Sequence, residues 1–195
     1  MRYYAHMRLI VMGGSLRRDS CNQRIAEVAG EGAAAAGADV TVLHLRNFAI
    51  PLFDPDDEAA NGPGAGALAL REAFRENDGV ILGVPEYNGG PPGALKNAID
   101  WLSRPQEGYG RLDCFAGKVC ALVSASPGHL GGIRGLPITR TILASLGMYV
   151  LPSQQCVSSV QDKFDAEGVM TCDATRTALH ALGEALTDTA RRLRT

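Results

Sequence analysis

Residues 79–90 read GVILGVPEYNGG, an unbroken apolar run that ends in a turn rich in proline, asparagine and glycine. A segment that is apolar at every position is typical of a β-strand covered by helices on both faces. Such strands occur in parallel sheets, whose neighbouring strands are connected through helices. This stretch therefore predicts an α/β fold, and the elements on either side of it are assigned by the same reasoning.

The rest of the chain alternates between strand and helix character. Strands are predicted over residues 8–12, 39–45, 79–84 and 118–124, and a short fifth strand begins at residues 149–151. Helices are predicted over residues 22–36, 67–77, 91–102, 133–146 and 174–193, the fourth with Pro137 in its first turn. Residues 48–66 are rich in Pro, Asp, Gly and Asn and predict a loop, in which the acidic run at residues 54–58 is solvated.

A length of 195 residues fits one domain. We expect this domain to span residues 1–195, with residues 1–7 as an N-terminal extension. Alternating strands and helices imply a three-layer sandwich, a five-stranded parallel sheet with helices on both faces. In such a sheet the loops after the first, third and fourth strands meet at the carboxyl ends of the strands, where ligands bind.

The composition excludes several classes of protein. Apolar residues make up 46% and charged residues 21%, which is typical of a globular rather than a disordered chain. The formal net charge of -2 offers no basic surface for nucleic acid or for an anionic membrane. There is neither an apolar run of about 18 residues nor a signal peptide, so we expect a cytoplasmic protein. Five cysteines without a Cys-x-x-Cys pair indicate reduced thiols and no metal site.

The first loop, residues 13–22, opens a helix and carries Ser15, Arg17, Ser20 and Asn22. Unpaired N–H groups and the positive end of the helix dipole attract anions at such a position. Short polar donors together with an arginine therefore predict a site for a phosphate monoester. The alternative is an ordinary strand–helix turn with Ser20 or Asn22 as the N-cap. The loop has neither a P-loop ending nor a Gly-x-Gly-x-x-Gly pattern, which disfavours ATP and dinucleotides.

Two further glycine-rich loops follow the third and fourth strands. The second loop, residues 85–101 with the helix that it opens, offers backbone amides and the ring of Tyr87, which suits a flat heteroaromatic ligand. Alternatively Tyr87 belongs to the core, and for Trp101 we favour packing of its helix. The third loop, residues 124–135, has glycines at positions 128, 131, 132 and 135, which allow a ligand to approach the backbone closely.

Three segments together resemble the NADPH-dependent FMN reductase family, the flavodoxin-like group that includes NAD(P)H quinone, azo-dye and chromate reductases. They are GSLR at residues 14–17 with Ser20 and Asn22, PEYN at residues 85–88 continuing to PGALKNAIDW at residues 92–101, and Gly131-Gly132. The segment PLFD at residues 51–54 is similar to the family as well. Gly89 and Gly90 stand where the family often carries a hydroxyl or a bulkier residue, which indicates a wider substrate opening.

The resemblance implies a flavodoxin-like fold with strand order 2-1-3-4-5 that binds FMN non-covalently. By position in the motifs, the phosphate would be held by Ser15, Arg17, Ser20 and Asn22. The ribityl chain and the ring would be lined by Pro85, Glu86, Tyr87, Asn88 and Gly89, and from the other side by Ser124, Ser126 and Gly132. The family also implies a homodimer or a homotetramer.

The implied activity is hydride transfer from NADPH or NADH through FMN to a small acceptor, in a ping-pong order. Quinones, azo dyes, metal oxyanions and free flavin all fit as acceptors. No catalytic side chain is required, and we expect backbone amides of the second or third loop to donate to the ring. Glu86 is expected to accept structural hydrogen bonds, and Arg134 to be either solvated or a contact for the 2′-phosphate of NADPH. Two alternatives remain, a flavodoxin-type electron carrier and a flavin-free protein that binds a phosphate ligand.

Overall fold

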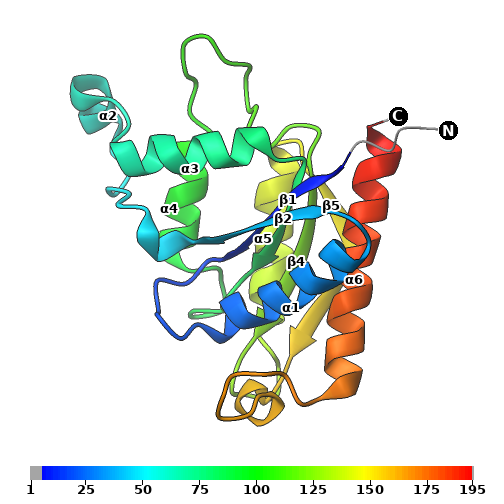
Figure 1. The fold of residues 1–195 in the computed structure, drawn as a ribbon. Coiled ribbons are helices and arrows are strands. Elements are labelled where there is room, and N and C mark those ends of the chain that lie inside the picture. Colours follow the sequence, from blue (N-terminus) through cyan, green and yellow to red (C-terminus); the bar gives the residue numbers. More distant parts are fainter. Residues whose placement is uncertain (1–5, 195) are drawn as a thin grey trace, which may run out of the picture.

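The computed structural model describes residues 6–194. Five strands form one parallel sheet in the predicted order β2-β1-β3-β4-β5 (Figure 1). They are β1 (Arg8–Gly13), β2 (Asp39–His44), β3 (Gly79–Gly83), β4 (Val119–Ala125) and β5 (Tyr149–Val157). Of the expected N-terminal extension, residues 1–5 lie outside the described part of the chain, and Met7 is buried in the core.

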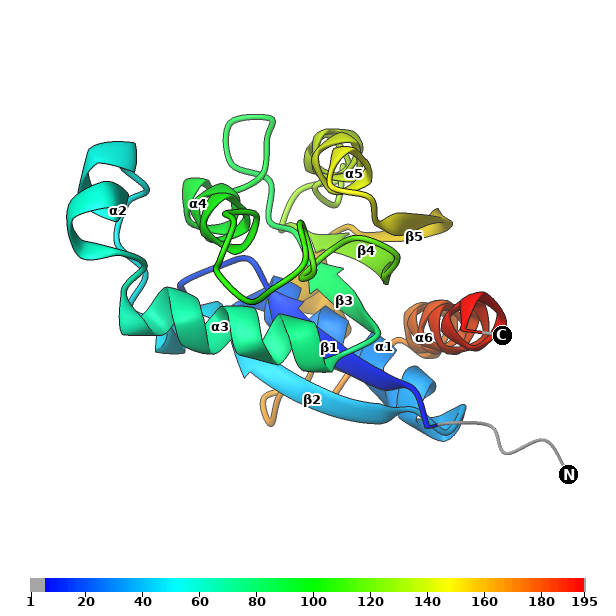
Figure 2. The same ribbon diagram turned by 90° about the horizontal axis from the view of Figure 1, so that it is seen from above.

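Helices cover both faces of the sheet (Figure 2). One face packs against α1 (Cys21–Ala35) and α6 (Asp173–Leu193), and the other against α3 (Ala65–Glu76), α4 (Gly93–Leu102) and α5 (Gly135–Ser145). Because side chains alternate along a strand, Leu9 and Val11 belong to the first apolar core, and Ile10 and Met12 to the second. The central strands are therefore apolar at most positions, and β3 at all of them. No helix within residues 6–194 is long and apolar enough to cross a membrane.

The two helices on the first face approach each other closely at a pair of glycines. A Cβ atom at Gly183 of α6 would lie 1.9 Å from the carbonyl oxygen of Ala29 in α1. A Cβ atom at Gly32 of α1 would lie 2.3 Å from the carbonyl oxygen of His180 in α6. Only glycine permits this separation, which allows α6 to cover the sheet beside α1.

The predicted loop over residues 48–66 is wrong in one respect, because it contains a short helix, α2 (Pro55–Asn61), which projects from the body of the protein (Figure 1). Asp54 is its N-cap and accepts the N–H of Asp56 at 2.9 Å, and Pro55 follows at the first helical position. The acidic run interpreted as a solvated loop is thus the start of a helix. Since α2 buries none of its residues, apolar periodicity does not reveal it.

The fifth strand is longer than the short strand predicted, and it runs to Val157. Its pairing with β4 is irregular, because Cys120 pairs with Val150 but Leu122 pairs with Gln154. Pro152 lies in the irregular part, as is usual for a proline on an edge strand. The polar second half of β5 lacks a strand pattern, yet it extends the sheet as far as the third loop. Pro137 lies in the first turn of α5, as predicted.

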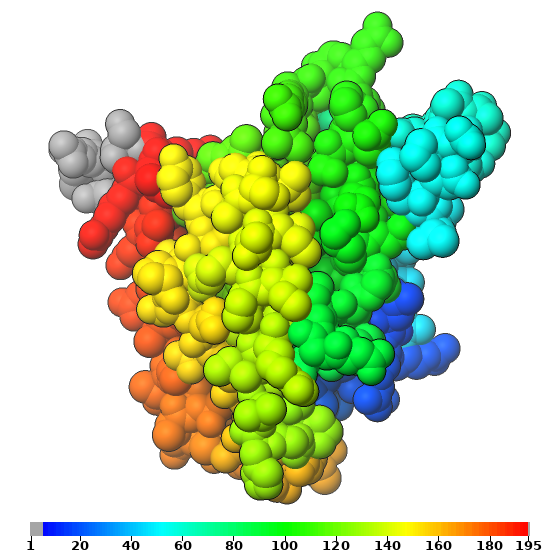
Figure 3. All heavy atoms as spheres, turned by 180° about the vertical axis from the view of Figure 1, so that it is seen from behind, coloured from blue at the N-terminus to red at the C-terminus, as the bar shows by residue number. Residues whose placement is uncertain are grey.

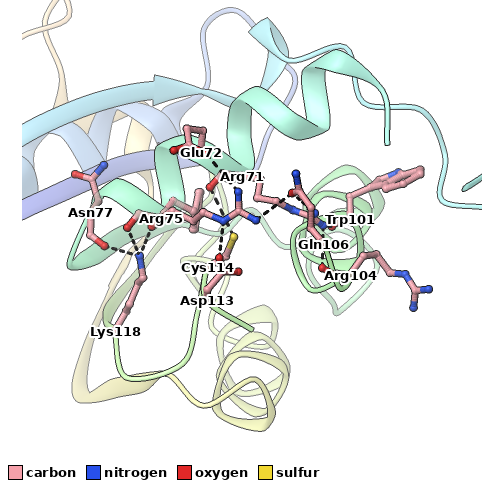
Figure 4. A network of polar contacts seen from close by, with 11 residues as sticks. Arg71, Glu72, Arg75, Asn77, Trp101, Arg104, Gln106, Asp113, Cys114 and Lys118 are labelled. Carbon is pink, nitrogen blue, oxygen red and sulfur yellow. Dashed lines mark hydrogen bonds and ion pairs between the residues drawn. The ribbon is translucent and has the colours of Figure 1, made fainter. Parts of the chain in front are cut away.

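A network of cationic side chains anchors the segment between α4 and β4 to helix α3 (Figure 4). Arg71 is buried and donates to Gln106 Oε1 at 2.7 Å and to the carbonyl oxygens of Trp101 and Arg104 at 2.6 and 3.0 Å. Lys118 Nζ donates to three carbonyl oxygens at the end of α3, and burial lowers its pKa. The network lies at the amino ends of β3 and β4, at the opposite edge of the sheet from the three loops.

Candidate functional site

The three loops leave the sheet side by side at its carboxyl edge. Gly13, Gly83 and Val123, at or near the ends of β1, β3 and β4, are neighbours in the sheet register. Hydrogen bonds continue past the strand ends, because the N–H of Gly14 donates to the oxygen of Gly83 at 2.7 Å and that of Val84 to the oxygen of Val123 at 2.8 Å. The sheet therefore brings together segments that are far apart in the sequence.

The first loop is folded tightly against α4. A Cβ atom at Gly14 would lie 2.7 Å from a methyl carbon of Leu95, so a larger residue would displace the loop. Ser15 is buried, and its hydroxyl accepts the N–H of Arg17 at 3.1 Å. The side chain of Arg17 is exposed and forms no ion pair within residues 6–194. Its charge is therefore available to a ligand.

Ser20 and Asn22 use their side chains within the protein. Ser20 is the N-cap of α1, and its hydroxyl accepts the N–H of Gln23 at 3.3 Å, which is the alternative role considered for it. Asn22 is buried and makes two hydrogen bonds of 2.9 Å with the backbone of Ala125, donating one and accepting the other. These contacts fasten the start of α1 to the end of β4 and so hold the first loop in place.

A cavity of about 320 Å³ lies between the first and second loops, which border each other in Figure 3 as the blue and green segments. It is lined by residues 14–17, by Tyr87 and by residues 92–94. Among the described residues that line it, Arg17 is the one with a charge. Ligand cavities for small molecules have volumes of roughly 300–1,000 Å³. The cavity therefore suits a small anionic ligand.

Tyr87 lies at this cavity and not in the core. The residue is 49% exposed, and its hydroxyl is 3.4 Å from Ser15 Oγ, so it reaches from the second loop to the first. Trp101, in contrast, is buried, donates from Nε1 to the carbonyl oxygen of Pro51 at 2.8 Å and packs edge-on against Phe53. The interpretation of Trp101 as a packing residue is confirmed, and that of Tyr87 as a core residue is excluded.

Residues 87–90 of the second loop form a tight hairpin. Tyr87 and Gly90 exchange backbone hydrogen bonds of 2.8 and 3.1 Å. Asn88 and Gly89 have φ angles of 52° and 84°, as in a type I′ turn, for which Asn-Gly is a preferred pair. Within the described residues, the N–H groups of Asn88 and Gly89 have no acceptor. They are the backbone donors of the second loop that a ligand can use.

The third loop closes over a buried serine. Ser124 donates from Oγ to the carbonyl oxygen of Val84 at 2.7 Å and is fully buried. Gly132 lies directly on it with a φ of 82°, and a Cβ atom there would be 2.0 Å from Ser124 Oγ. Ser126 donates to the carbonyl oxygen of Gly128 at 3.2 Å. Ser124 thus supports the third loop from below, and the buried backbone at Gly132 packs directly on it.

Glu86 connects the second loop to the third. Pro85 is buried, and the carboxylate of Glu86 accepts the backbone N–H of Arg134 at 2.9 Å and its Nε–H at 2.6 Å. The hydrogen bond from the Arg134 side chain is the main cause that lowers the pKa of Glu86. The structural role expected for Glu86 is confirmed, and Arg134 is engaged by a carboxylate and is not simply solvated.

Sequence reasoning did not select Pro92, Gly93 and Ala94, although all three line the cavity. They form the start of α4, where Pro92 is the N-cap and offers no side-chain hydrogen bond to the helix. The first N–H groups of α4 therefore remain unpaired beside the cavity. The feature of the sequence that could have indicated them is the glycine at position 93. Helix packing does not require a glycine there, because a Cβ atom would meet nothing within 4 Å.

The fold and the cavity define the class of this protein: a flavodoxin-like α/β domain with a cavity for a small anionic ligand at the carboxyl edge of its sheet. The sequence matches the family described as NADPH-dependent FMN reductase over residues 7–162. The chain belongs to this family, as its motifs predict.

Relatives cover nearly the whole chain. The NAD(P)H-dependent FMN reductase PA1204 of Pseudomonas aeruginosa is 34% identical over 96% of this chain and 97% of its own. A quinone reductase of Escherichia coli K12 is 36% identical over 83% of this chain and 82% of its own. Among solved structures, FerB of Paracoccus denitrificans, a flavoenzyme NAD(P)H:(acceptor) oxidoreductase, has a TM-score of 0.77 with 28% identity, covering 95% of this chain and 98% of its own. The predicted oxidoreductase class is confirmed.

Proposed function

We propose that this protein is an NAD(P)H-dependent oxidoreductase that binds FMN non-covalently and reduces small acceptors such as quinones, azo compounds, metal oxyanions or free flavin. The proposal rests above all on the cavity of about 320 Å³ between the first and second loops, in which Arg17 carries the charge. FMN joins a phosphate dianion to a flat ring system, and it needs both a cationic pocket and an open, glycine-lined surface.

The first loop would hold the phosphate. Ser15 and Arg17 line the cavity directly and would contact it. The first N–H groups of α4 lie beside the same cavity and favour negative charge. Ser20 and Asn22 would contribute by fixing the loop and the start of α1, since their polar atoms already have partners in the protein.

The ring would lie between the second and third loops. We expect Pro85, Glu86, Tyr87, Asn88 and Gly89 on one side of it, and on the other Ser126 and Gly132 with the buried Ser124 behind them. The N–H groups of Asn88 and Gly89 have no acceptor within residues 6–194 and would donate to polar atoms of the ring. Fixed neutral donors of this kind stabilise negative charge that develops during a reaction.

When bound, FMN supplies the chemistry, which is hydride transfer from NADPH or NADH and delivery of two electrons to an acceptor in a ping-pong order. The protein supplies orientation and an opening. A Cβ atom at Gly89 would meet nothing within 4 Å, and one at Gly90 only the end of the Ile138 side chain at 3.9 Å. This rim without side chains admits acceptors of varied shape to the second loop.

We also propose a homodimer or homotetramer that works in the cytoplasm. Large apolar side chains are exposed on the second and third loops and on α5, namely Tyr87, Leu130, Ile133 and Ile138. Exposed apolar side chains grouped in this way are typical of a surface covered by another chain. Light scattering coupled to size-exclusion chromatography measures the molar mass in solution and so the number of subunits.

The test begins with the purified, FMN-reconstituted protein. Bound oxidised flavin absorbs at about 450 nm, and NADPH should bleach this band rapidly in a stopped-flow instrument. Re-oxidation by a benzoquinone should follow in a second, separate mixing experiment. Binding of FMN without bleaching by NADPH or NADH would instead identify a flavodoxin-type electron carrier. Absence of FMN binding would identify a flavin-free protein of the same fold.

A further inference from the structure

Glu86 belongs to the second loop, but its carboxylate is bonded to a residue of the third loop. Its side chain is 7% exposed, whereas that of Arg134 is 64% exposed. Oε2 accepts the backbone N–H of Arg134 at 2.9 Å, Oε1 accepts the Nε–H at 2.6 Å, and Nη2 also contacts Oε1. Both carboxylate oxygens are thus bonded to one residue that is 48 positions away in the chain. Charge-assisted hydrogen bonds of this kind are the strong ones in proteins.

Helix α5 begins at this link. Its N-cap is Arg134, whose side chain makes no capping hydrogen bond, so the N–H groups at the start of α5 depend on other acceptors. The carboxylate of Glu86 accepts the N–H of Arg134 at 2.9 Å, and the carbonyl oxygen of Gly132 accepts that of Gly135 at 3.3 Å. The positive end of the helix dipole favours a carboxylate at this place. The second loop therefore caps the helix that follows the third loop.

The two loops lie next to each other around this link. A Cβ atom at Gly132 would lie 3.6 Å from the Cβ atom of Glu86. A Cβ atom at Gly135 would lie 3.6 Å from the carbonyl carbon of Gly90 and 3.7 Å from the Cα atom of Glu86. The space between the two loops is therefore about the size of one methyl group at each position. Movement of Glu86 would therefore change the position of one loop relative to the other.

We propose that Glu86 and Arg134 form a positioning pair that sets the separation between the second and third loops, and so the shape of the slot that receives the flavin ring. The pair acts through the hairpin at residues 87–90 on one side and through Gly131 and Gly132 on the other. The identity of the ring rests on the proposed function, whereas the link between the loops exists without any ligand.

Three variants test the pair. Glu86→Gln keeps the shape of the side chain and removes its charge, Arg134→Met removes the guanidinium and keeps the backbone N–H, and the third variant combines both. We expect each single substitution to weaken FMN binding about tenfold, because each removes the charge-assisted hydrogen bond between the two side chains. The double variant should bind FMN with about the same affinity as the single variant that binds it less tightly, because both substitutions break the same link.

The matched control is Arg104→Met. It breaks the ion pair between Arg104 and Glu58, with Nε 2.8 Å from Oε2, which lies outside the residues that line the cavity. FMN affinity should stay unchanged in this variant. The midpoint potential and the visible spectrum of bound flavin should shift in Glu86→Gln and Arg134→Met but not in Arg104→Met, because only the first two alter the loops beside the ring. A role in folding alone would move none of these spectra.

Amide hydrogen exchange on the FMN-free protein tests the link apart from the flavin. Faster exchange at residues 86–90 and 131–136 in Glu86→Gln, with little change in α6, supports the pair. This result would support it even in a protein that binds no FMN, an outcome that overturns the proposed function alone. Unchanged exchange in both segments overturns the positioning pair. So do additive losses of FMN affinity, or an unchanged flavin potential in a protein that binds FMN.

Discussion

Arg17 provides the positive charge of the cavity, and within residues 6–194 no carboxylate pairs with it. Arg17→Met removes the charge and keeps much of the alkyl chain. We expect the dissociation constant of FMN to rise about tenfold to hundredfold, since hydrogen bonds to charged groups contribute about 1.5–3 kcal/mol. Quenching of FMN fluorescence measures it. The control is Arg18→Met, an exposed neighbour that does not line the cavity. Equal losses in both variants would show that net charge matters and position does not.

The lowered pKa of Glu86 makes a prediction about acid stability. Its hydrogen bonds to Arg134 favour the ionised form of the carboxyl group. Burial and the charge of Glu86 raise the pKa of Cys156, so this thiol is neutral at acid pH and does not titrate in the same range. The stabilisation is present above the unfolded pKa of about 4.3 and is lost as the pH falls through the lower pKa of the folded state. The Tm difference between wild type and Glu86→Gln should therefore be largest near neutral pH and shrink on acidification. A difference that stays constant in thermal scans down to about pH 2 would contradict it.

The contact between helices α1 and α6 depends on the absence of a side chain at Gly183, where a Cβ atom would lie 1.9 Å from the oxygen of Ala29. Replacing glycine by alanine in a helix gains about 1 kcal/mol of helix propensity. Overpacking a close contact costs about 1–3 kcal/mol or more and here involves rigid backbone, so it outweighs that gain. We expect Gly183→Ala to lower the free energy of unfolding, measured by urea titration.

Thr177→Ala, on the exposed face of the same helix, serves as its control. A surface substitution of this kind should change the free energy of unfolding by no more than about 0.5 kcal/mol. A Gly183→Ala variant as stable as this control would show that the two helices separate at little cost.

The cationic network in Figure 4 joins the segment before β4 to helix α3 through the buried side chain of Arg71. Arg71→Met would leave the carbonyl oxygen of Arg104 without its donor inside the protein, and that of Trp101 with only the N–H of Arg104 at 3.3 Å. We expect a loss of about 1–3 kcal/mol in the free energy of unfolding, the usual cost of leaving a buried polar group unpaired. FMN affinity should not change, because the network is at the other edge of the sheet. Arg111→Met, exposed on the same segment, is the matched control.

The two apolar cores lie on opposite faces of one sheet and share its strands, so we expect the protein to unfold in a single cooperative transition. A ligand that binds only the folded state at about 100 times its dissociation constant adds about 2.7 kcal/mol to the free energy of unfolding. FMN should therefore raise Tm, and riboflavin, which lacks the phosphate, should raise it less at the same concentration. Equal shifts with both ligands would contradict a phosphate site at Arg17.

Apolar patterning accounts for most of what could be predicted about this fold. Runs such as residues 79–84 and the paired faces of β1 specify buried parallel strands, because few other arrangements cover a strand on both sides. The elements that escaped prediction, α2 and the second half of β5, bury little apolar surface or pair irregularly. Their stability comes from capping and from strand pairing, which leave no apolar period in the sequence.

In the candidate site, too, some residues could be predicted from the sequence and others could not. Ser15, Arg17 and Tyr87 could be selected from the sequence, because a polar glycine-rich loop after a buried strand lies at the ligand edge of a parallel sheet. Tertiary structure alone decided that Asn22 bonds to Ala125 and Glu86 to Arg134. These partners come from different loops, and a hydrogen bond forms only within a narrow range of distance and angle, which the packing of the whole sheet sets.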